Sequence, residues 1–291
     1  MRPARHRSLN SKPADLGGLL RKEFVLKILF LGDVVGEPGR KVIKRFVPIL
    51  REKHSLDVVI ANVENMAGGF GITPETYLEL TQAGVDIMTG GNHSFDKKEG
   101  VPVHEEETNI IRPLNYPEGT PGRGFVLHTT TKGLKIGVIN VMGRTFMEAL
   151  DCPFLAADTA YAELVKSTPI IVVDIHAEAT SEKNAMGWYF DGRASLVIGS
   201  HTHVQTGDER ILPGGTAYMT DAGMTGPYDS VIGVRKEIII QKFLTRRGRR
   251  FEAAQNDAWL SGAIVDIDEN TGRASSIERI RIENDRPSTH P

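Results

Sequence analysis

Two short motifs place metal-binding side chains close together in the chain. The heptapeptide GGNHSFD, which begins at residue 90, sets the amide of Asn92 beside the imidazole of His93. The pentapeptide GSHTH, which begins at residue 199, carries His201 and His203 two residues apart. Residues i and i+2 of a strand point to the same face, so we expect these two imidazoles to reach one cluster of ions.

Further oxygen and nitrogen donors follow other strand-like runs of the sequence. They are Asp33, Glu64, Asn65 and His176. This set of carboxylates, amides and imidazoles without a thiolate suits iron, manganese or zinc better than copper(I) or an iron–sulfur cluster. A carboxylate such as Glu64 can bridge two ions about 3.5–4 Å apart, an arrangement used to attack phosphate esters. A lone Asn92 is more often a satisfied core residue, but the recurrence of donors after five strands favours an enzyme that hydrolyses phosphoesters.

Composition sets limits on the class of protein. The 291 residues are 40% apolar and 25% charged, as in ordinary globular proteins, and we expect one folded domain. The net charge of -2 gives no global attraction to nucleic acid or to an anionic membrane. The single cysteine, Cys152, excludes an intramolecular disulfide and favours the cytoplasm. No apolar run approaches the roughly 20 residues that a membrane helix needs.

Apolar runs followed by helical patterns predict a sheet covered on both faces. The strand-like runs begin at Lys27, Asp57, Asp86, Pro169 and Leu196. Helices are expected over residues 39–54, shortened or kinked by Pro48, over 74–84 after an N-cap at Thr73, and over 181–193 after a cap at Ser181. In open α/β sheets ligands bind beyond the carboxyl ends of the strands, where the donor residues lie.

The second half of the chain changes from βα units to hairpins, which suggests a second sheet packed on the first. We expect hairpins over residues 124–141, 210–220 and 262–283, and strand over 235–245. Residues 221–233 contain three glycines and Pro227 and are too long for a simple connector. They are a candidate lid, in which Tyr228 would stack on a base or line the pocket, although a solvated loop is an equal alternative.

The two ends of the chain and the other histidines are expected to be peripheral. Residues 1–26 carry six Arg or Lys and are interpreted as a flexible N-terminal extension, residues 27–285 as the single domain, and 286–291 as a C-terminal tail. The remaining histidines are predicted to be surface groups: His6, His54, His104, His128 and His290.

Taken together, these motifs resemble the calcineurin-like metallophosphoesterases, and most closely their bacterial cyclic-nucleotide phosphodiesterase family (YmdB-like). The resemblance runs from about residue 27 to residue 283 and rests on Gly32-Asp33, Glu64-Asn65, Gly91-Asn92-His93, His176 and Gly199-Ser-His201-Thr-His203. The general superfamily has Asp-x-His in its first motif and a bridging Asp. This chain has Asp33-Val34-Val35 and offers Glu64, and the YmdB-like family looks the same in both places.

The resemblance implies an α/β fold, a four-layer α/β/β/α sandwich of two mixed sheets, with a di-iron or di-manganese centre. One ion would be held by Asp33, Glu64, Asn65 and His203, and the other by Glu64, Asn92, His176 and His201. His93 would protonate the leaving ribose oxygen after attack by a hydroxide that bridges the ions. The implied substrates are 2′,3′- and 3′,5′-cyclic nucleotides.

Two other functions remain open at the level of sequence. The same metals could serve a phosphatase or a nuclease, although the net charge gives no strong nucleic-acid signal. The metal-loaded scaffold could also be a non-catalytic regulatory or RNA-binding protein. The sequence decides neither the native metal, nor the physiological nucleotide, nor whether the chain forms a homo-oligomer.

Overall fold

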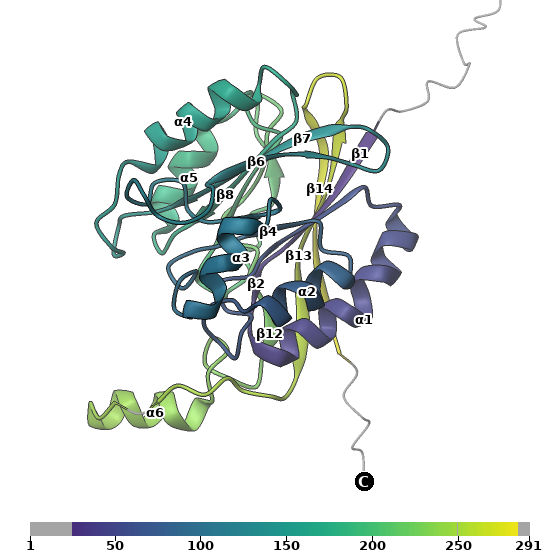
Figure 1. Cartoon of the computed structure of the whole chain (residues 1–291). Coiled ribbons are helices and arrows are strands. Elements are labelled where there is room, and N and C mark those ends of the chain that lie inside the picture. Colours follow the sequence, from purple (N-terminus) through teal and green to yellow (C-terminus); the bar gives the residue numbers. More distant parts are fainter. Residues whose placement is uncertain (1–24, 249, 285–291) are drawn as a thin grey trace, which may run out of the picture.

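Two β-sheets face each other in the computed structural model, which describes residues 25–248 and 250–284 (Figure 1). The first sheet has the order β2-β12-β13-β1-β3-β4-β5, with β14 paired to β13, and the second has the order β10-β11-β9-β8-β7-β6. The strands of the first sheet are β1 (Val25–Leu31), β2 (Asp33–Val34), β3 (Val58–Asn62), β4 (Ile87–Thr89), β5 (Ile110–Ile111), β12 (Met224–Pro227), β13 (Ala258–Asp268) and β14 (Ala274–Glu283). Those of the second are β6 (Phe125–Thr129), β7 (Lys135–Met142), β8 (Ile171–His176), β9 (Leu196–Ser200), β10 (Arg210–Ile211) and β11 (Ala217–Met219). Both sheets mix parallel and antiparallel pairs, as expected.

Helices other than α6 cover the outer faces of the two sheets (Figure 1). The helices of the described chain are α1 (Gly36–His54), α2 (Pro74–Gln82), the 3-10 turn η1 (Lys98–Gly100), α3 (Val101–Glu106), α4 (Pro153–Leu164), α5 (Thr180–Tyr189) and α6 (Lys236–Thr245). Thr73 caps α2 in a capping box with Thr76, and Pro74 is its first residue, as the sequence predicts.

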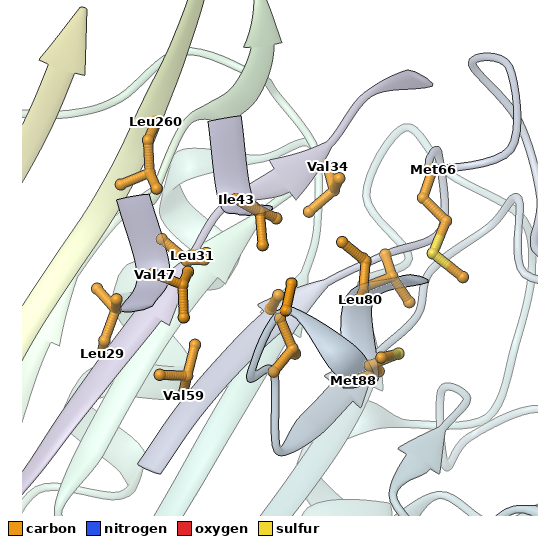
Figure 2. Close-up of a cluster of buried hydrophobic side chains, with 14 of the residues drawn as sticks. Leu29, Leu31, Val34, Ile43, Val47, Val59, Met66, Leu80, Met88 and Leu260 are labelled. Carbon is orange, nitrogen blue, oxygen red and sulfur yellow. The ribbon is translucent and has the colours of Figure 1, made fainter. Parts of the chain in front are cut away.

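Three separate apolar cores show that the fold has four layers. Alternate residues of β1 point to opposite faces, so Ile28 and Phe30 pack between the two sheets while Leu29 and Leu31 pack against α1 and α2 (Figure 2). A third core lies between the second sheet and α4 and α5. The predicted α/β/β/α sandwich of two mixed sheets is therefore confirmed.

Parallel strands carry the predicted site residues to one edge. In the first sheet β1, β3 and β4 run parallel, and in the second β7, β8 and β9 run parallel. Asp33, Glu64 and Asn92 follow the first three strands, and His176 and His201 end or follow β8 and β9.

The strand expected over residues 235–245 is wrong, because this segment forms helix α6. The run of three isoleucines has high strand propensity, but Ile238 and Ile239 are both buried while Ile240 is exposed, which is not the alternation of a half-buried strand. Helix α6 extends away from the rest of the fold (Figure 1).

Details of two predicted helices are also wrong. Helix α1 is not shortened at Pro48 but continues to His54, and Pro48 lies on its exposed face, where water can bond the carbonyl that lacks a partner. Helix α5 begins at Thr180, with Ala179 rather than Ser181 at its N-cap position.

The lid predicted over residues 221–233 is wrong for its first half, and so is the role predicted for Tyr228. Strand β12 occupies part of this segment and is buried between β2 and β13. Tyr228 stacks on Trp259 with ring centroids 4.2 Å apart, and its hydroxyl donates to the carbonyl of Met224 at 3.0 Å.

The described residues include no helix with the length and apolar character needed to cross a membrane. The structure places Val25 and Leu26, which were predicted to belong to the N-terminal extension, in β1. The predicted flexible extension otherwise lies outside the described residues, as does the C-terminal tail.

Candidate metal centre

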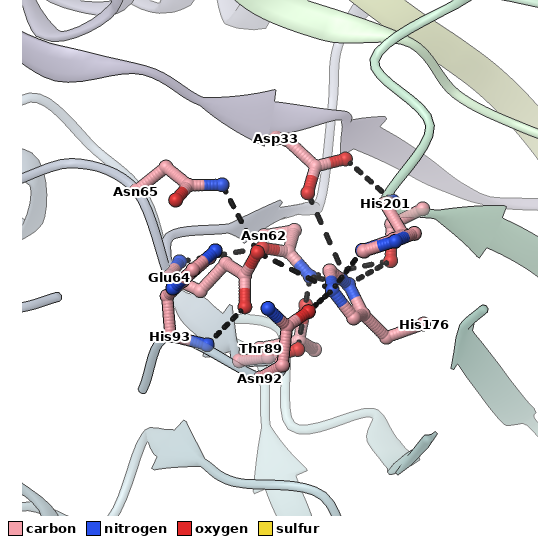
Figure 3. Close-up of polar contacts among 12 residues, drawn as sticks. Asp33, Asn62, Glu64, Asn65, Thr89, Asn92, His93, His176 and His201 are labelled. Atoms are coloured by element: carbon pink, nitrogen blue, oxygen red, sulfur yellow. Dashed lines mark hydrogen bonds and ion pairs between the residues drawn. The ribbon is translucent and has the colours of Figure 1, made fainter. Parts of the chain in front are cut away.

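Four side chains from both sheets point one donor atom each at a common position (Figure 3). The Nε2 atom of His176 lies 3.0 Å from Asn92 Oδ1, 3.1 Å from His201 Nδ1 and 3.3 Å from Glu64 Oε1. Candidate ligand atoms of Glu64, His176 and His201 all lie within 4.8 Å of one another. This group could hold a metal ion, and it contains the four residues of the second ligand set that the family resemblance implies.

A second group of donors shares Glu64 with the first. His203 Nε2 is 3.7 Å from Asp33 Oδ1 and 3.3 Å from Asn65 Nδ2, and Asn65 Nδ2 donates to Glu64 Oε1 at 3.0 Å. A half-turn of the Asn65 amide would present its oxygen to the same place. All seven predicted ligands are thus brought together, and Glu64 contacts residues of both groups.

Each imidazole has a partner for its outer ring nitrogen, so that its other nitrogen faces the centre. The carbonyl of Ile232 accepts from His203 Nδ1 at 2.8 Å, and the carboxylate of Glu178 lies 3.3 Å from His201 Nε2. His176 Nδ1 lies 3.0 Å from the hydroxyl of Ser200, which itself donates to Asp174 at 2.8 Å and so accepts from the ring. Such outer partners fix the tautomer and orientation of metal-binding histidines.

The two histidines of GSHTH face the centre for a different reason from the one predicted. Strand β9 ends at Ser200, and His201 and His203 follow it with positive φ angles of 97° and 63°. Residues other than glycine rarely adopt such angles, and they persist only where the surroundings impose them. Buried carboxylates hold this loop: Asp221 accepts from Lys183 at 2.6 Å and from the Thr202 hydroxyl at 2.7 Å, and Asp33 accepts from the backbone N–H of His201 at 3.0 Å.

A buried polar network beneath the ligands joins the two sheets and was not predicted. Asp174 accepts from Thr89 at 2.5 Å and from Asn62 at 3.3 Å, so a residue of β8 is bonded to residues of β3 and β4. Asn62, Thr89 and Asp174 are polar residues in otherwise apolar strands, and this contrast in the sequence could have indicated a buried polar network. Asp221 and Lys183 gave no such signal, because Lys183 lies in a helix and Asp221 in a loop, where charged residues are common.

The charges of the centre depend on one another. Burial alone would lower the pKa of His176, but Glu64, Asp33 and Asp174 outweigh it and raise that pKa to about 9. Burial would raise the pKa of Glu64, but His176 and His93 hold it at about 2. Burial and the charge on His176 lower the pKa of His201 to about 3. At neutral pH, His176 is therefore a positively charged imidazolium and His201 is a neutral imidazole.

The residues fit a divalent cation on the evidence of the structure itself. Asp33 Oδ1 is fully buried and has no hydrogen-bond partner in the described part of the chain. Burial raises the pKa of Asp33, which shows the cost of a charged oxygen at this position. Buried charges are usually paired or bound to metal, and a cation beside Asp33, Glu64 and the neutral imidazoles would satisfy this requirement.

The predicted general acid, His93, lies at the edge of the centre. Its backbone N–H donates to Glu64 Oε2 at 2.8 Å, while its ring Nδ1 is 2.7 Å from the carboxylate of Asp96. Asp96 therefore accepts from Nδ1, which leaves Nε2 for proton exchange. His93 also lines a cavity that opens beside the centre.

His104 is not the surface group that the sequence predicts. It is fully buried, and its ring packs 4.8 Å from that of Phe95, in the loop that carries Asn92. Burial lowers its pKa to about 4, so it is a neutral packing residue. His54 and His128 are partly buried, and His6 and His290 lie outside the described residues.

Comparison with known proteins assigns the family. The family model described as YmdB-like protein matches residues 29–280. The chain belongs to the YmdB-like family. It is 52% identical over 260 residues to a Bacillus subtilis protein named 2′,3′-cyclic-nucleotide 2′-phosphodiesterase, and the match covers 89% of this chain and 98% of that protein.

Two solved structures of similar proteins agree with the fold. A hypothetical protein from Thermus thermophilus is 43% identical with a TM-score of 0.83, and the match covers 89% of this chain and 100% of that one. A protein described as a novel phosphatase from Mycoplasma pneumoniae is 36% identical with a TM-score of 0.84, covering 90% of this chain and 95% of that one.

The proton on His176 predicts how metal binding depends on pH. A metal ion needs the neutral imidazole, so loading at any pH well below 9 must displace this proton, and affinity should rise with pH up to about 9. Addition of Mn²⁺ to metal-free protein at pH 7.5 should release about one proton per chain, measured in a pH-stat. The control His128→Gln should release the same amount. Saturable Mn²⁺ binding without proton release would contradict this description of the centre.

Proposed function

We propose that this protein is a metal-dependent phosphodiesterase that hydrolyses cyclic nucleotides, with 2′,3′-cyclic nucleotides as its principal substrates. The observation that carries the proposal is the convergence of Asn92 Oδ1, His176 Nε2 and His201 Nδ1 beside one oxygen of Glu64. The printed activity of the Bacillus subtilis relative supports the choice of substrate.

Two ions are proposed to occupy the centre, with iron or manganese as the candidate metals. One would be held by Asp33, Glu64, Asn65 and His203, and the other by Glu64, Asn92, His176 and His201. When bound, the ions would polarise the phosphate and lower the pKa of water towards neutrality, so that hydroxide is available as the nucleophile.

The residues around the ions position the reacting groups. Ile232 and Glu178 hold the rings of His203 and His201 from behind, so that their inward nitrogens keep the same direction during the reaction. Attack at phosphorus forms a new P–O bond and breaks the bond to one ribose oxygen. His93 donates its Nε2 proton to that leaving oxygen, while Asp96 holds Nδ1 and stabilises the ring.

A substrate panel tests the proposed reaction. Metal-loaded protein should convert 2′,3′-cyclic AMP into a phosphomonoester, followed by phosphorus NMR, with metal content measured on the same sample. Asp33→Asn serves as the inactive control, because it removes a buried charge from the centre. Hydrolysis of adenosine 3′-monophosphate alone would instead support a phosphatase, the activity in the description of the Mycoplasma pneumoniae structure. Absence of turnover with the metals bound would leave the regulatory or RNA-binding alternative.

The role of His93 is tested by the nature of the leaving group. His93→Ala should keep the metals and the fold, while kcat for a cyclic nucleotide falls by roughly 10²–10⁴-fold. A p-nitrophenyl phosphodiester should be affected less, because p-nitrophenolate leaves without protonation. If the variant lost metal, or lost both activities equally, His93 would be a ligand or a structural support.

A further inference from the structure

A cavity of about 400 Å³ opens directly beside the candidate metal centre. Its floor includes Glu64, Asn65, His93 and His203, which are all assigned to the reaction above. Its volume lies within the range of about 300–1,000 Å³ found for small-molecule sites. The cavity extends beyond the space that a phosphate group needs.

One wall of this cavity is aromatic. The ring of Phe70 lies edge-on to His93 with centroids 5.0 Å apart, and the ring of Phe251 follows at 6.0 Å from Phe70 with an interplanar angle of 35°. These two residues, here called the aromatic wall, come from loops far apart in the sequence. They form a continuous apolar surface that leads away from the general acid.

Helix α6 and the segment before it supply the other walls. Ile239, Lys242 and Phe243 line the cavity from α6, together with residues 231–234. Phe243 is 77% exposed although it lines the cavity, so most of its ring surface is open to contact by a ligand. The Nζ atom of Lys242 lies 4.6 Å from the centroid of Phe251, which places one hydrogen-bond donor at the aromatic wall.

We infer that this cavity is a nucleobase site, in which the base of the nucleotide lies against the aromatic wall. The inference rests on the proposed function and adds a subsite to it. Hydrolysis of a phosphodiester requires only the polar floor, so an aromatic wall that begins at His93 is explained by a flat, largely apolar group joined to the phosphate through ribose. Aromatic residues bind bases through their faces, and every base has such a face.

The chemistry of the walls also sets the selectivity. Apart from Lys242, the side chains of the aromatic wall and of α6 at the cavity offer no polar atom for reading the edge of a base. Glu178 and Thr202 also line the cavity, but Glu178 lies 3.3 Å from His201 and the Thr202 hydroxyl donates to Asp221. Recognition is therefore expected to come from stacking strength, with purines bound somewhat better than pyrimidines and without strict discrimination.

The test compares a substrate that has a base with one that lacks it. Adenosine 2′,3′-cyclic phosphate and methyl riboside 2′,3′-cyclic phosphate contain the same reacting phosphate, so only the first uses the nucleobase site. Phe251→Ala should raise KM for the adenosine substrate roughly 5-fold to 150-fold, the effect of losing one stacking contact. The same change should leave hydrolysis of the methyl riboside substrate unaltered.

Matched variants separate the loss of aromatic stacking from the loss of side-chain volume and from non-specific effects of removing a ring. Phe251→Leu keeps apolar volume without an aromatic face and should give an intermediate KM. Phe146→Ala removes a ring that is 88% exposed and outside the cavity, and it should behave as wild type. Saturation-transfer NMR with adenosine gives a readout without turnover: the adenine protons should receive saturation from wild type and from Phe146→Ala, and much less from Phe251→Ala.

Failure of the inference and failure of the proposed function give different results. Equal KM values for the two substrates in wild type, or no effect of Phe251→Ala on either KM or saturation transfer, would overturn the nucleobase site while hydrolysis continued. If neither substrate were hydrolysed by metal-loaded wild type, the proposed function itself would be wrong.

Discussion

The structure depends on a set of electron-pair donors that face one another inside the protein. Asp33 and Glu64 are buried carboxylates. The inward nitrogen of His203 faces Asp33, and that of His201 faces the inward nitrogen of His176. In the metal-free chain, His176 is positively charged, and its Nε2–H faces three acceptors: Asn92 Oδ1, His201 Nδ1 and Glu64 Oε1. This positive charge stabilises the surrounding carboxylates. Asp33 Oδ1 accepts no hydrogen bond from the described residues, and the nearest imidazole nitrogens, of His203 and His176, lie 3.7 and 3.9 Å away. A bound cation would take the place of the proton on His176 and would also bind the buried oxygen of Asp33.

The four-layer fold is what brings these donors together. Apolar residues between the sheets hold β3 and β4 opposite β8 and β9, so that loops from both sheets meet at one edge. Asp174 then fixes the two sheets to each other through Thr89 and Asn62. Asp221, paired with Lys183, and Asp33 hold the left-handed backbone of the GSHTH loop. The buried polar groups beneath the candidate ligands thus help to orient the ligand side chains towards the centre.

Much of this arrangement could be predicted from sequence because strand periodicity is local. The apolar runs in the sequence indicated the parallel strands. Residues that directly follow parallel strands meet at one edge of a sheet, so the seven donors could be assigned to one site before the fold was known. The geometry of His201 and His203 could not be predicted, since it depends on contacts with Asp33 and Asp221 and not on strand alternation. The burial of Tyr228 against Trp259, and the aromatic wall of Phe70 and Phe251, also arise from contacts between distant segments. The three isoleucines of α6 misled the prediction because strand propensity is weak against tertiary context.

Metal content per chain tests the central claim most directly. Chelated protein reloaded with Mn²⁺ should contain two ions per chain by elemental analysis. His203→Ala should retain about one, because the donors of the other site, Asn92, His176 and His201 with Glu64, remain intact. Glu64→Ala should disturb both sites, because its carboxylate contacts residues of both. One ion per chain in saturated wild type, or loss of both ions from His203→Ala alone, would contradict a two-ion centre bridged by Glu64.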